Sequence, residues 1–349
     1  MEDQAPKQPR RVRYKGTHPK SFKEKYKELQ PEQYAEDIAK VIQQGRTPAG
    51  MHRSICVNEI MEFLRITPGQ TGLDATLGYG GHSLEILKQL GPQGKLYATD
   101  VDPLELPRTR DRLASYGYGP DVLIIKKMNF SQIDQITDEA GPLSFILADL
   151  GVSSMQIDNP ERGFSFKVEG PLDLRLNPKT GKSAAARLKT ISQEELESLL
   201  LQNSDEPYNK QIAKGIISAI GKGIAIETTT RLKEIIAEAL EFLPADILKE
   251  EIKKSCQRCF QALRIDVNDE FGALEKFLEK LPDALLSGGR VAILSFHSGE
   301  DRRVKKSFQR LFREGIYSEV APDPIRPSVE ECSTNPRARS AKLRWAIKA

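Results

Sequence analysis

The sequence predicts an α/β protein built on an open, mostly parallel sheet, with a block of helices inserted into it. Short apolar runs alternate with helical patterns between about residues 58 and 151, which is typical of parallel strands covered on both faces. The alternation then stops, and residues 159–265 show helical patterns with almost no strand pattern. It resumes over residues 266–349. The sheet is therefore expected to form from two separated blocks of sequence.

Each element follows from a local pattern. In the first block, helical patterns separate four continuous apolar runs, and Gly91 marks the end of one helix. In the inserted block, apolar residues recur at helical spacing in three segments. The last block contains one helical pattern and two further strands. The predicted strands are 71–76, 95–102, 122–130, 144–151, 288–297 and 341–348, and the predicted helices are 58–64, 82–90, 103–114, 192–201, 210–220, 230–240 and 271–281.

The domain organisation predicted from these patterns has three parts. Residues 1–50 are expected to form a polar arm and one amphipathic helix, residues 51–158 and 266–349 the sheet domain, and residues 159–265 a helical domain. No window reaches the apolar length of a membrane span, and the N-terminus lacks the apolar core of an export signal. We therefore expect a cytoplasmic protein with no membrane association.

Charge and cysteine content exclude little by themselves. The net charge of +3 is small, but basic residues cluster near both ends, around Arg10 and around Arg337, Arg339 and Lys342. These clusters form a phosphate-contacting surface if they meet in the fold, and two solvated tails if they do not. The C-Q-R-C pair at 256–259 has metal-ligand spacing, but no second pair completes a site. No metal is expected.

The stretch D-A-T-L-G-Y-G-G-H-S, residues 74–83, follows the first predicted strand, where open parallel sheets bind ligands. A dinucleotide-binding loop requires G-x-G-x-x-G, and Ser83 stands where its last glycine or alanine would be. Asp74, just before the loop, suits a phosphate poorly and suits the cationic groups of S-adenosylmethionine well. The loop thus favours a methyltransferase, and a nicotinamide-dependent oxidoreductase remains the alternative.

Three further residues follow predicted strands and are expected at the same edge of the sheet. Asp100 lies about twenty residues beyond the glycine loop, and one carboxylate can accept hydrogen bonds from both ribose hydroxyls of a nucleoside. Phe130 offers an aromatic ring for an adenine face. Asp149 begins the stretch D-L-G-V-S-S.

Seven motifs in order resemble one known family. The chain is similar, from about His52 to its end, to the bacterial family (RsmH, formerly MraW, type) that methylates N4 of a cytidine in the decoding centre of small-subunit (16S) ribosomal RNA. The resemblance implies a class I, Rossmann-like, S-adenosylmethionine-dependent methyltransferase whose sheet is interrupted by a helical domain for RNA recognition. The motifs are D-A-T-L-G-Y-G-G-H-S, D-L-G-V-S-S-M-Q-I-D, E-R-G-F-S-F, G-P-L-D-L-R-L, F-Q-A-L-R-I-D-V-N-D-E, S-F-H-S-G-E-D-R and N-P-R-A-R-S-A-K-L-R.

The resemblance also implies roles for the residues that match the family's cofactor motifs. The glycine loop corresponds to the segment that holds the methionine part of the cofactor, Asp100 to the ribose-binding acid and Phe130 to the residue beside the adenine. Two contacts come from the stretch after the fourth strand. The implied cofactor residues are Gly78, Gly80, Gly81, His82, Asp100, Phe130, Asp149 and Gln156.

For catalysis, we predict that Asp149, with Ser153 or Ser154, bridges the cofactor and the target amine. The exocyclic amine of cytosine is a weak nucleophile, so it needs acceptors for its hydrogens, in-line alignment with the methyl group and exclusion of water. In the alternative, Asp149 contacts only the cofactor and the serines cap the following turn. The target cytidine is expected to leave its stack.

Several residues are candidates for RNA contact. Asp173 and Arg175 either form an ion pair at the pocket mouth or face the target nucleotide. His297 either contacts RNA or belongs to a structural network. Arginine forks match phosphate oxygens, so the basic residues near the C-terminus are predicted phosphate contacts. These are Arg337, Arg339 and Lys342.

The resemblance further implies a folded or nearly assembled ribosomal subunit as substrate, and a homodimer is an open alternative. Two alternative functions remain. The chain could carry out the same chemistry on another cytidine or on an organellar ribosome, or it could be a ribosome assembly factor without catalytic activity. Two departures from the family pattern concern the target more than the cofactor. Gly299 replaces a leucine, and Lys254-Ser255-Cys256 replaces H-P-A.

Overall fold

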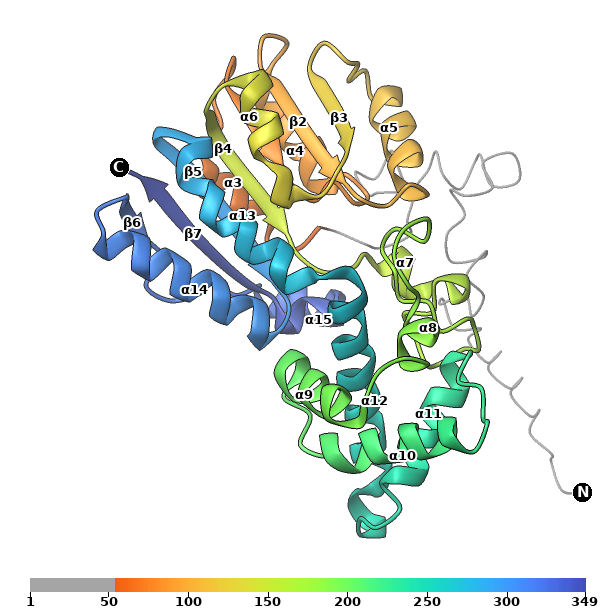
Figure 1. The fold of residues 1–349 in the computed structure, drawn as a ribbon. Coiled ribbons are helices and arrows are strands. Elements are labelled where there is room, and N and C mark those ends of the chain that lie inside the picture. Colours follow the sequence, from red (N-terminus) through yellow and green to blue (C-terminus); the bar gives the residue numbers. More distant parts are fainter. Residues whose placement is uncertain (1–53) are drawn as a thin grey trace, which may run out of the picture. The chain divides into compact units, whose positions relative to one another are not determined.

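The computed structural model describes residues 54–349, which are built around one sheet. The predicted arm and helix of residues 1–50 lie outside the described residues. The sheet has seven strands in the order β3-β2-β1-β4-β5-β7-β6, and the expected class of fold is confirmed (Figure 1). The strands are β1 Thr71–Asp74, β2 Lys95–Asp100, β3 Leu123–Lys127, β4 Leu143–Asp149, β5 Leu285–Ser295, β6 Tyr317–Val320 and β7 Lys342–Lys348.

The strand order puts a topological switch point between β1 and β4, and open parallel sheets bind ligands at such points. Both β2 and β4 pair in parallel with β1, with Asp74 beside Ala98 on one side and Leu147 on the other. The chain leaves β1 towards β2 and later returns to β4 on the opposite side, so β1 and β4 border a topological switch point. One strand near the far edge differs, because β7 runs antiparallel to both of its neighbours, β5 and β6.

Helices cover both faces of the sheet, as the alternation predicted (Figure 1). On one face, Ile60, Ile86 and Leu113 pack with the strand residues Leu96 and Leu147. The other face packs its own set of apolar side chains from α6, α13 and α14. The helices of the first face are α3 Val57–Leu64, α4 Gly81–Leu90 and α5 Glu105–Ser115, and those of the second are α6 Asp134–Ala140, α13 Glu270–Ala284 and α14 Ser298–Arg313.

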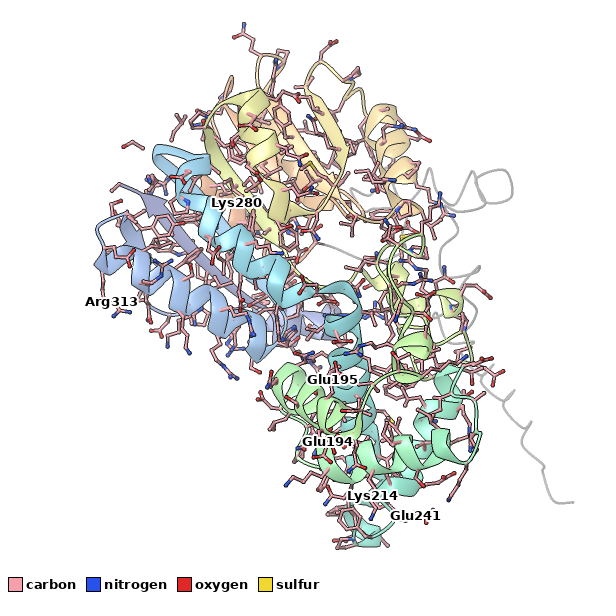
Figure 2. The ribbon with its side chains drawn as sticks, viewed as in Figure 1. Glu194, Glu195, Lys214, Glu241, Lys280 and Arg313 are labelled. Carbon is pink, nitrogen blue, oxygen red and sulfur yellow. The ribbon has the colours of Figure 1, made fainter. Side chains whose placement is uncertain are left out.

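Between β4 and β5 the described chain contains helices and no named strand. Their apolar faces share one hydrophobic core, while charged side chains such as Glu194 and Lys214 are exposed on the outside (Figure 2). The division into separate sheet and helical domains at 159–265 stays a prediction. The main helices of this block are α7 Ser154–Asp158, α8 Ala184–Leu188, α9 Gln193–Ser204, α10 Asn209–Gly221, α11 Thr229–Ala239 and α12 Ala245–Asn268.

The short elements include three 3₁₀ turns, η2 Phe130–Gln132, η3 Pro160–Arg162 and η4 Pro336–Ser340, and the helix α15 Val329–Thr334. The helices of the described region include none with the length and apolar character needed to cross a membrane. The elements that were not predicted include the helices α6, α12 and α14 and the edge strand β6.

Candidate active site

The glycine loop forms a tight connection between β1 and α4. Gly78 and Gly80 have left-handed φ angles of 47° and 74°, which glycine adopts without the penalty of a side chain. At Gly81 the constraint is space, because a Cβ atom would lie 2.1 Å from the hydroxyl of Ser54. By contrast, Gly78 faces open space, with Thr76 O at 3.8 Å from a built Cβ. Protein atoms thus fill the space next to Gly81, whereas the space next to Gly78 is open.

Asp100, at the end of β2, faces this loop as predicted. Its Oδ2 accepts a hydrogen bond of 2.8 Å from the Gly78 N–H, and its Oδ1 accepts one of 2.9 Å from the Asp102 N–H. Burial raises the pKa of Asp100 to about 6, although these two N–H groups oppose the shift. Each carboxylate oxygen has a second lone pair, so the side chain can still accept bonds from a ligand.

Asp74 is buried at the end of β1, with 1% of its surface exposed. The hydroxyl of Ser83 donates a 2.6 Å hydrogen bond to its Oδ2, and the Thr76 N–H donates a 3.1 Å bond to its Oδ1. Ser83 therefore stands where a dinucleotide loop would have its third glycine because it holds a buried carboxylate. Direct contact between Asp74 and a cationic ligand stays a prediction.

Asp149, at the end of β4, is bound to the loop through its backbone. Its N–H donates a 2.6 Å hydrogen bond to the Thr76 hydroxyl. Its side-chain Oδ1 is buried and has no hydrogen-bond partner among residues 54–349. Burial raises the pKa of Asp149 to about 6; the charge of His82 opposes the shift, and those of Asp74 and Glu300 add to it. The structure thus keeps a buried acceptor without a partner at the switch point.

His82 lies between Asp149 and the segment before α3. Its Nδ1 is 3.5 Å from Asp149 Oδ2, and its Nε2 is 3.0 Å from the carbonyl oxygen of Ile55. The sequence motifs gave no sign of the Ile55 contact, because a backbone carbonyl leaves no trace in residue type.

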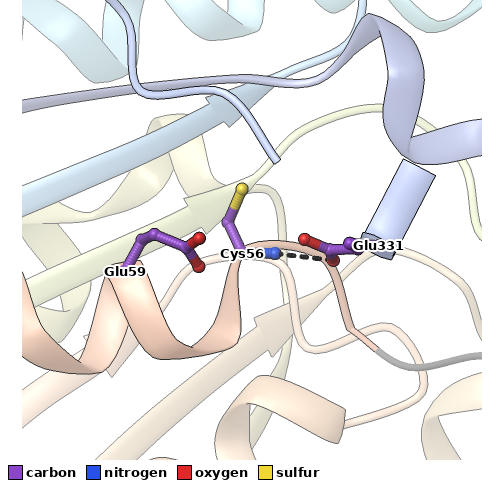
Figure 3. Close-up of side chains that lie close together, drawn as sticks. All are labelled: Cys56, Glu59 and Glu331. Atoms are coloured by element: carbon purple, nitrogen blue, oxygen red, sulfur yellow. Dashed lines mark hydrogen bonds between the residues drawn. The ribbon is translucent and has the colours of Figure 1, made fainter. Parts of the chain in front are cut away.

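The neighbouring Cys56 fixes that segment in place. Its N–H donates a 3.0 Å hydrogen bond to Glu331 Oε1 of α15, and the thiol lies between Glu59 and Glu331 (Figure 3). Burial, reinforced by these two carboxylates and by Asp149, raises the pKa of the Cys56 thiol to about 12. The sulfur is therefore a protonated thiol, which is a poor metal ligand.

Gln156 and Ser153 brace the turn after β4. The Ser153 hydroxyl accepts a hydrogen bond from the Gln156 N–H, and Gln156 Oε1 accepts one from the Ser153 N–H, which is a capping box at the start of α7. Ser153 therefore forms the helix cap that was expected if the serines are structural and not catalytic. Ser154 is the first, half-buried residue of the same helix. A catalytic role for either serine stays a prediction.

Arg162 is a residue that the sequence analysis missed. It is 5% exposed, and its guanidinium donates to Asp102 Oδ2 at 2.7 Å and to the carbonyls of Arg175 and Leu176. The side-chain amide of Gln156 donates to the same Asp102 oxygen at 2.7 Å. Arg162 therefore links the segment after β4 to Asp102, two residues beyond the predicted ribose-binding Asp100. The motif E-R-G-F-S-F contained the signal.

Phe130 begins η2 and is half-buried. Its ring packs edge-on against Phe277 of α13, with centroids 5.1 Å apart. Contact with an adenine stays a prediction.

Asp173 and Arg175 form the predicted ion pair. Two hydrogen bonds of 2.7 Å join the guanidinium to both carboxylate oxygens. The residue between them, Leu174, is buried and has a left-handed φ of 64°, a conformation that costs about 1–3 kcal/mol in a non-glycine residue. The pair thus belongs to a tightly held turn.

The basic residues near the C-terminus already have partners in two of three cases. Arg337 donates to Asp158 at 2.8 Å, and Lys342 donates to Asp301 at 2.8 Å. Arg339 is exposed and makes no hydrogen bond or ion pair within the described part of the chain. The three predicted phosphate contacts therefore differ in whether an acidic side chain already pairs with them. Among the described residues, Arg339 has no such partner.

His297 lies in a network of side chains at the end of β5. Its Nε2 is 3.2 Å from Glu300 Oε1, and its ring lies 5.8 Å from that of Phe271. A Cβ at Gly299 would come within 2.6 Å of the Phe271 ring. Phe271 therefore occupies the space that a side chain at position 299 would need. RNA contact by His297 stays a prediction.

The second departure from the family pattern lies inside the helical core. Ser255 is buried, and its hydroxyl donates a 3.0 Å hydrogen bond to the buried Glu206. Cys256 is buried beside it, and burial raises the pKa of its thiol to about 12. Lys254 is half exposed and pairs with Glu250 of the same helix. The C-Q-R-C pair thus packs as buried thiols within α12.

Known proteins of similar sequence show the family of this chain. The sequence profile described as the MraW methylase family matches residues 49–349. The chain belongs to the MraW methylase family. It is 73% identical over 349 residues to the ribosomal RNA small subunit methyltransferase H 2 of Alkaliphilus metalliredigens, covering 100% of each chain. It is 66% identical to the methyltransferase H 1 of Lachnoclostridium phytofermentans, covering 100% of this chain and 95% of that one. The family predicted from the seven motifs is confirmed.

Proposed function

We propose that this chain of the MraW methylase family transfers the methyl group of S-adenosylmethionine to N4 of a cytidine in the decoding centre of small-subunit ribosomal RNA. One observation carries the chemistry. The buried Oδ1 of Asp149 has no hydrogen-bond partner in residues 54–349, and it lies at the switch point beside the glycine loop. The names of the close relatives support the RNA substrate.

The residues at this edge fit the cofactor. Asp100 retains lone pairs for the ribose hydroxyls, and the open face of Gly78 leaves room above the loop. Asp74, Asp100 and Asp149 lie around the loop with no lysine or arginine paired to them in the described chain. The ammonium and sulfonium groups of S-adenosylmethionine would supply the missing positive charge, and its sulfonium methyl is the electrophile. NAD, with its pyrophosphate, would add negative charge instead.

The chemistry required of the protein is modest. The lone pair of the cytosine amine is delocalised, so the site must accept an amine hydrogen, align the nitrogen with the methyl group and exclude water. Asp149 Oδ1 is the acceptor. Ser153 is already used as a helix cap, so Asp149 carries the role without it. The target base must leave its stack to reach this edge.

We further propose that the helical block, residues 159–265, and the exposed Arg339 contact RNA. The substrate would be an assembled or nearly assembled subunit in the cytoplasm, since the decoding centre is a folded structure. A homodimer remains a second possibility for the active form.

The test uses small subunits from a bacterial strain that lacks its own MraW-family gene. The purified chain and S-adenosylmethionine should produce N4-methylcytidine at one position, mapped by mass spectrometry, and Asp149→Ala should not. Methylation at another cytidine would change the target but keep the chemistry. Binding to the subunit without methyl transfer would favour an assembly factor, and binding of NAD but not S-adenosylmethionine would favour an oxidoreductase. Naked RNA serves as the control for the assembled substrate.

A further inference from the structure

His82 is held at both ring nitrogens, and the two contacts fix where its proton lies. A carbonyl oxygen only accepts hydrogen bonds, so Nε2, 3.0 Å from the Ile55 oxygen, must carry a hydrogen. In the neutral ring, Nδ1 is then an acceptor. It faces another acceptor, Asp149 Oδ2, at 3.5 Å. Two lone pairs facing each other in a buried site repel, unless one proton lies between them.

The surroundings prevent the ring from turning away from Asp149. His82 is only 5% exposed, at the start of α4. The Ile55 carbonyl belongs to the segment fixed by the Cys56 N–H bond to Glu331 (Figure 3). The backbone of Asp149 is fixed by the Thr76 hydroxyl. Both members of the pair are therefore held, and Oδ1 of Asp149 is left as the free atom.

We propose that His82 is a positioning residue of the methyl transfer, which shares one proton with Asp149 Oδ2 and so leaves Oδ1 to take the proton that the target amine releases. This proposal rests on the function proposed above. It assigns His82 a part in the proton balance, in addition to the cofactor contact implied by its motif.

The atoms and charges balance as follows. Methyl transfer forms an N–C bond, breaks an S–C bond and leaves the cytosine amine with one extra proton. Asp149 Oδ1 accepts that proton. A proton that rests on Oδ2 moves to His82 Nδ1 at the same time; a proton already on Nδ1 stays there. Both starting states end with a neutral Asp149 and an imidazolium at His82.

When the proton starts on Oδ2, the positive charge lost from sulfur reappears on His82, where the protein can stabilise it. When the proton starts on Nδ1, that charge neutralises Asp149 beside the existing imidazolium. The ionisable groups around the pair are Asp74 of β1, Glu300 of α14 and the thiol of Cys56. The two carboxylates favour an imidazolium, and the thiol stays neutral. Burial also raises the pKa of Asp149 to about 6, so Asp149 is a stronger base than an exposed aspartate while remaining mostly ionised at neutral pH.

Two substitutions separate proton sharing from a purely structural role. His82→Gln places an amide nitrogen near the position of Nε2, so the bond to Ile55 can persist while the Nδ1 proton site is lost. His82→Asn places an amide near Asp149 and loses the Ile55 bond. We expect His82→Gln to lower the single-turnover rate about 10- to 100-fold with S-adenosylhomocysteine affinity within about threefold, and to move the acid limb of the rate to higher pH. A structural role predicts instead that His82→Gln stays close to wild type and that only His82→Asn is impaired.

A double-mutant cycle with Asp149→Asn gives the decisive comparison. If the pair acts as one unit, His82→Gln adds little to the loss already caused by Asp149→Asn. Independent effects that multiply would overturn the proposal. If the wild-type chain methylates no small-subunit RNA, the proposed function fails, whereas methylation by the wild type with multiplicative losses sinks only the pairing.

A second readout does not depend on activity. The chain has four histidines, so the ring nitrogens of His82 can be assigned by ¹⁵N NMR in the protein without ligand. We expect a protonated Nε2 and an Nδ1 signal that changes in Asp149→Asn. A ring protonated at Nδ1 with a free Nε2 lone pair would contradict the shared proton.

Discussion

The carboxylates at the ends of β2 and β4 and the carboxylate beside β7 have opposite electrostatic character. At the glycine-loop edge, burial raises the pKa of Asp100 and of Asp149 to about 6. Beside β7, Asp301 is also buried, but Arg344 donates to one oxygen at 2.6 Å and Lys342 to the other at 2.8 Å. Against the effect of burial, these two cations hold the pKa of Asp301 below its ordinary value.

The difference distinguishes a site from a scaffold. A carboxylate with its own cation is neutralised within the fold and stabilises it. A buried or half-buried carboxylate without a cation costs stability, and it persists where a ligand brings the opposite charge. The loop carboxylates belong to the second kind, which is why a cationic cofactor fits there. The carboxylates of the first kind include the partners of two predicted RNA contacts, since Arg337 pairs with Asp158 and Lys342 pairs with Asp301.

Removing Asp149 should give the largest effect. We expect Asp149→Asn to reduce single-turnover methyl transfer by about 10³-fold or more while making the protein more stable at pH 7.5. The folded-state pKa of about 6 lies above the ordinary aspartate value of 3.8, so ionisation destabilises the fold above about pH 6, by up to about 3 kcal/mol. The stability gain should disappear below about pH 4. Urea denaturation at both pH values measures it.

The matched change on the scaffold side is Asp301→Asn, which should do the opposite. It leaves the buried Arg344, 5% exposed, without its charge partner, at a cost of about 3 kcal/mol. The folded protein should still transfer methyl groups within about threefold of wild type. Because the pKa of Asp301 is lowered, its contribution is present above the unfolded value and is lost as pH falls. The difference between wild type and variant should therefore shrink in acid.

The exposed Asp205, whose carboxylate lies 3.5 Å from Arg302, provides the control for Asp301. Asp205→Asn should change the free energy of unfolding by less than about 1 kcal/mol. A comparable loss of unfolding free energy in Asp205→Asn and Asp301→Asn would mean that burial does not increase the contribution of the ion pair to stability.

Ser153 tests whether the turn after β4 is structural. Ser153→Ala removes the helix cap of α7 and should cost about 1 kcal/mol of stability. Methyl transfer at a temperature where the variant is folded should stay within about threefold. A loss of activity close to that of Asp149→Asn, with unchanged stability, would restore the catalytic interpretation of this serine.

Much of the fold could be predicted from sequence because its central strands are continuous apolar runs buried on both faces. The edge strand β6 was missed because its four residues carry two exposed polar side chains and its partner β7 lies far along the chain. The glycine loop and Asp100 were predicted to lie together because parallel strands end at one edge. The bond from His82 to Ile55 and the pair of Arg337 with Asp158 were not, because the first uses a backbone carbonyl and the second joins residues 179 positions apart.

The smallest expected effect concerns the two arginines of η4, which differ in partner. Arg339→Ala should weaken binding to the small subunit several-fold and reduce the dependence of log affinity on log salt by about one, because a free guanidinium can neutralise one phosphate. Arg337→Ala should instead cost about 1 kcal/mol of stability through loss of its bond to Asp158. Subunit binding across a salt series, with urea denaturation alongside, measures both. Equal loss of affinity in the two variants would show that the ion pair with Asp158 opens when RNA binds.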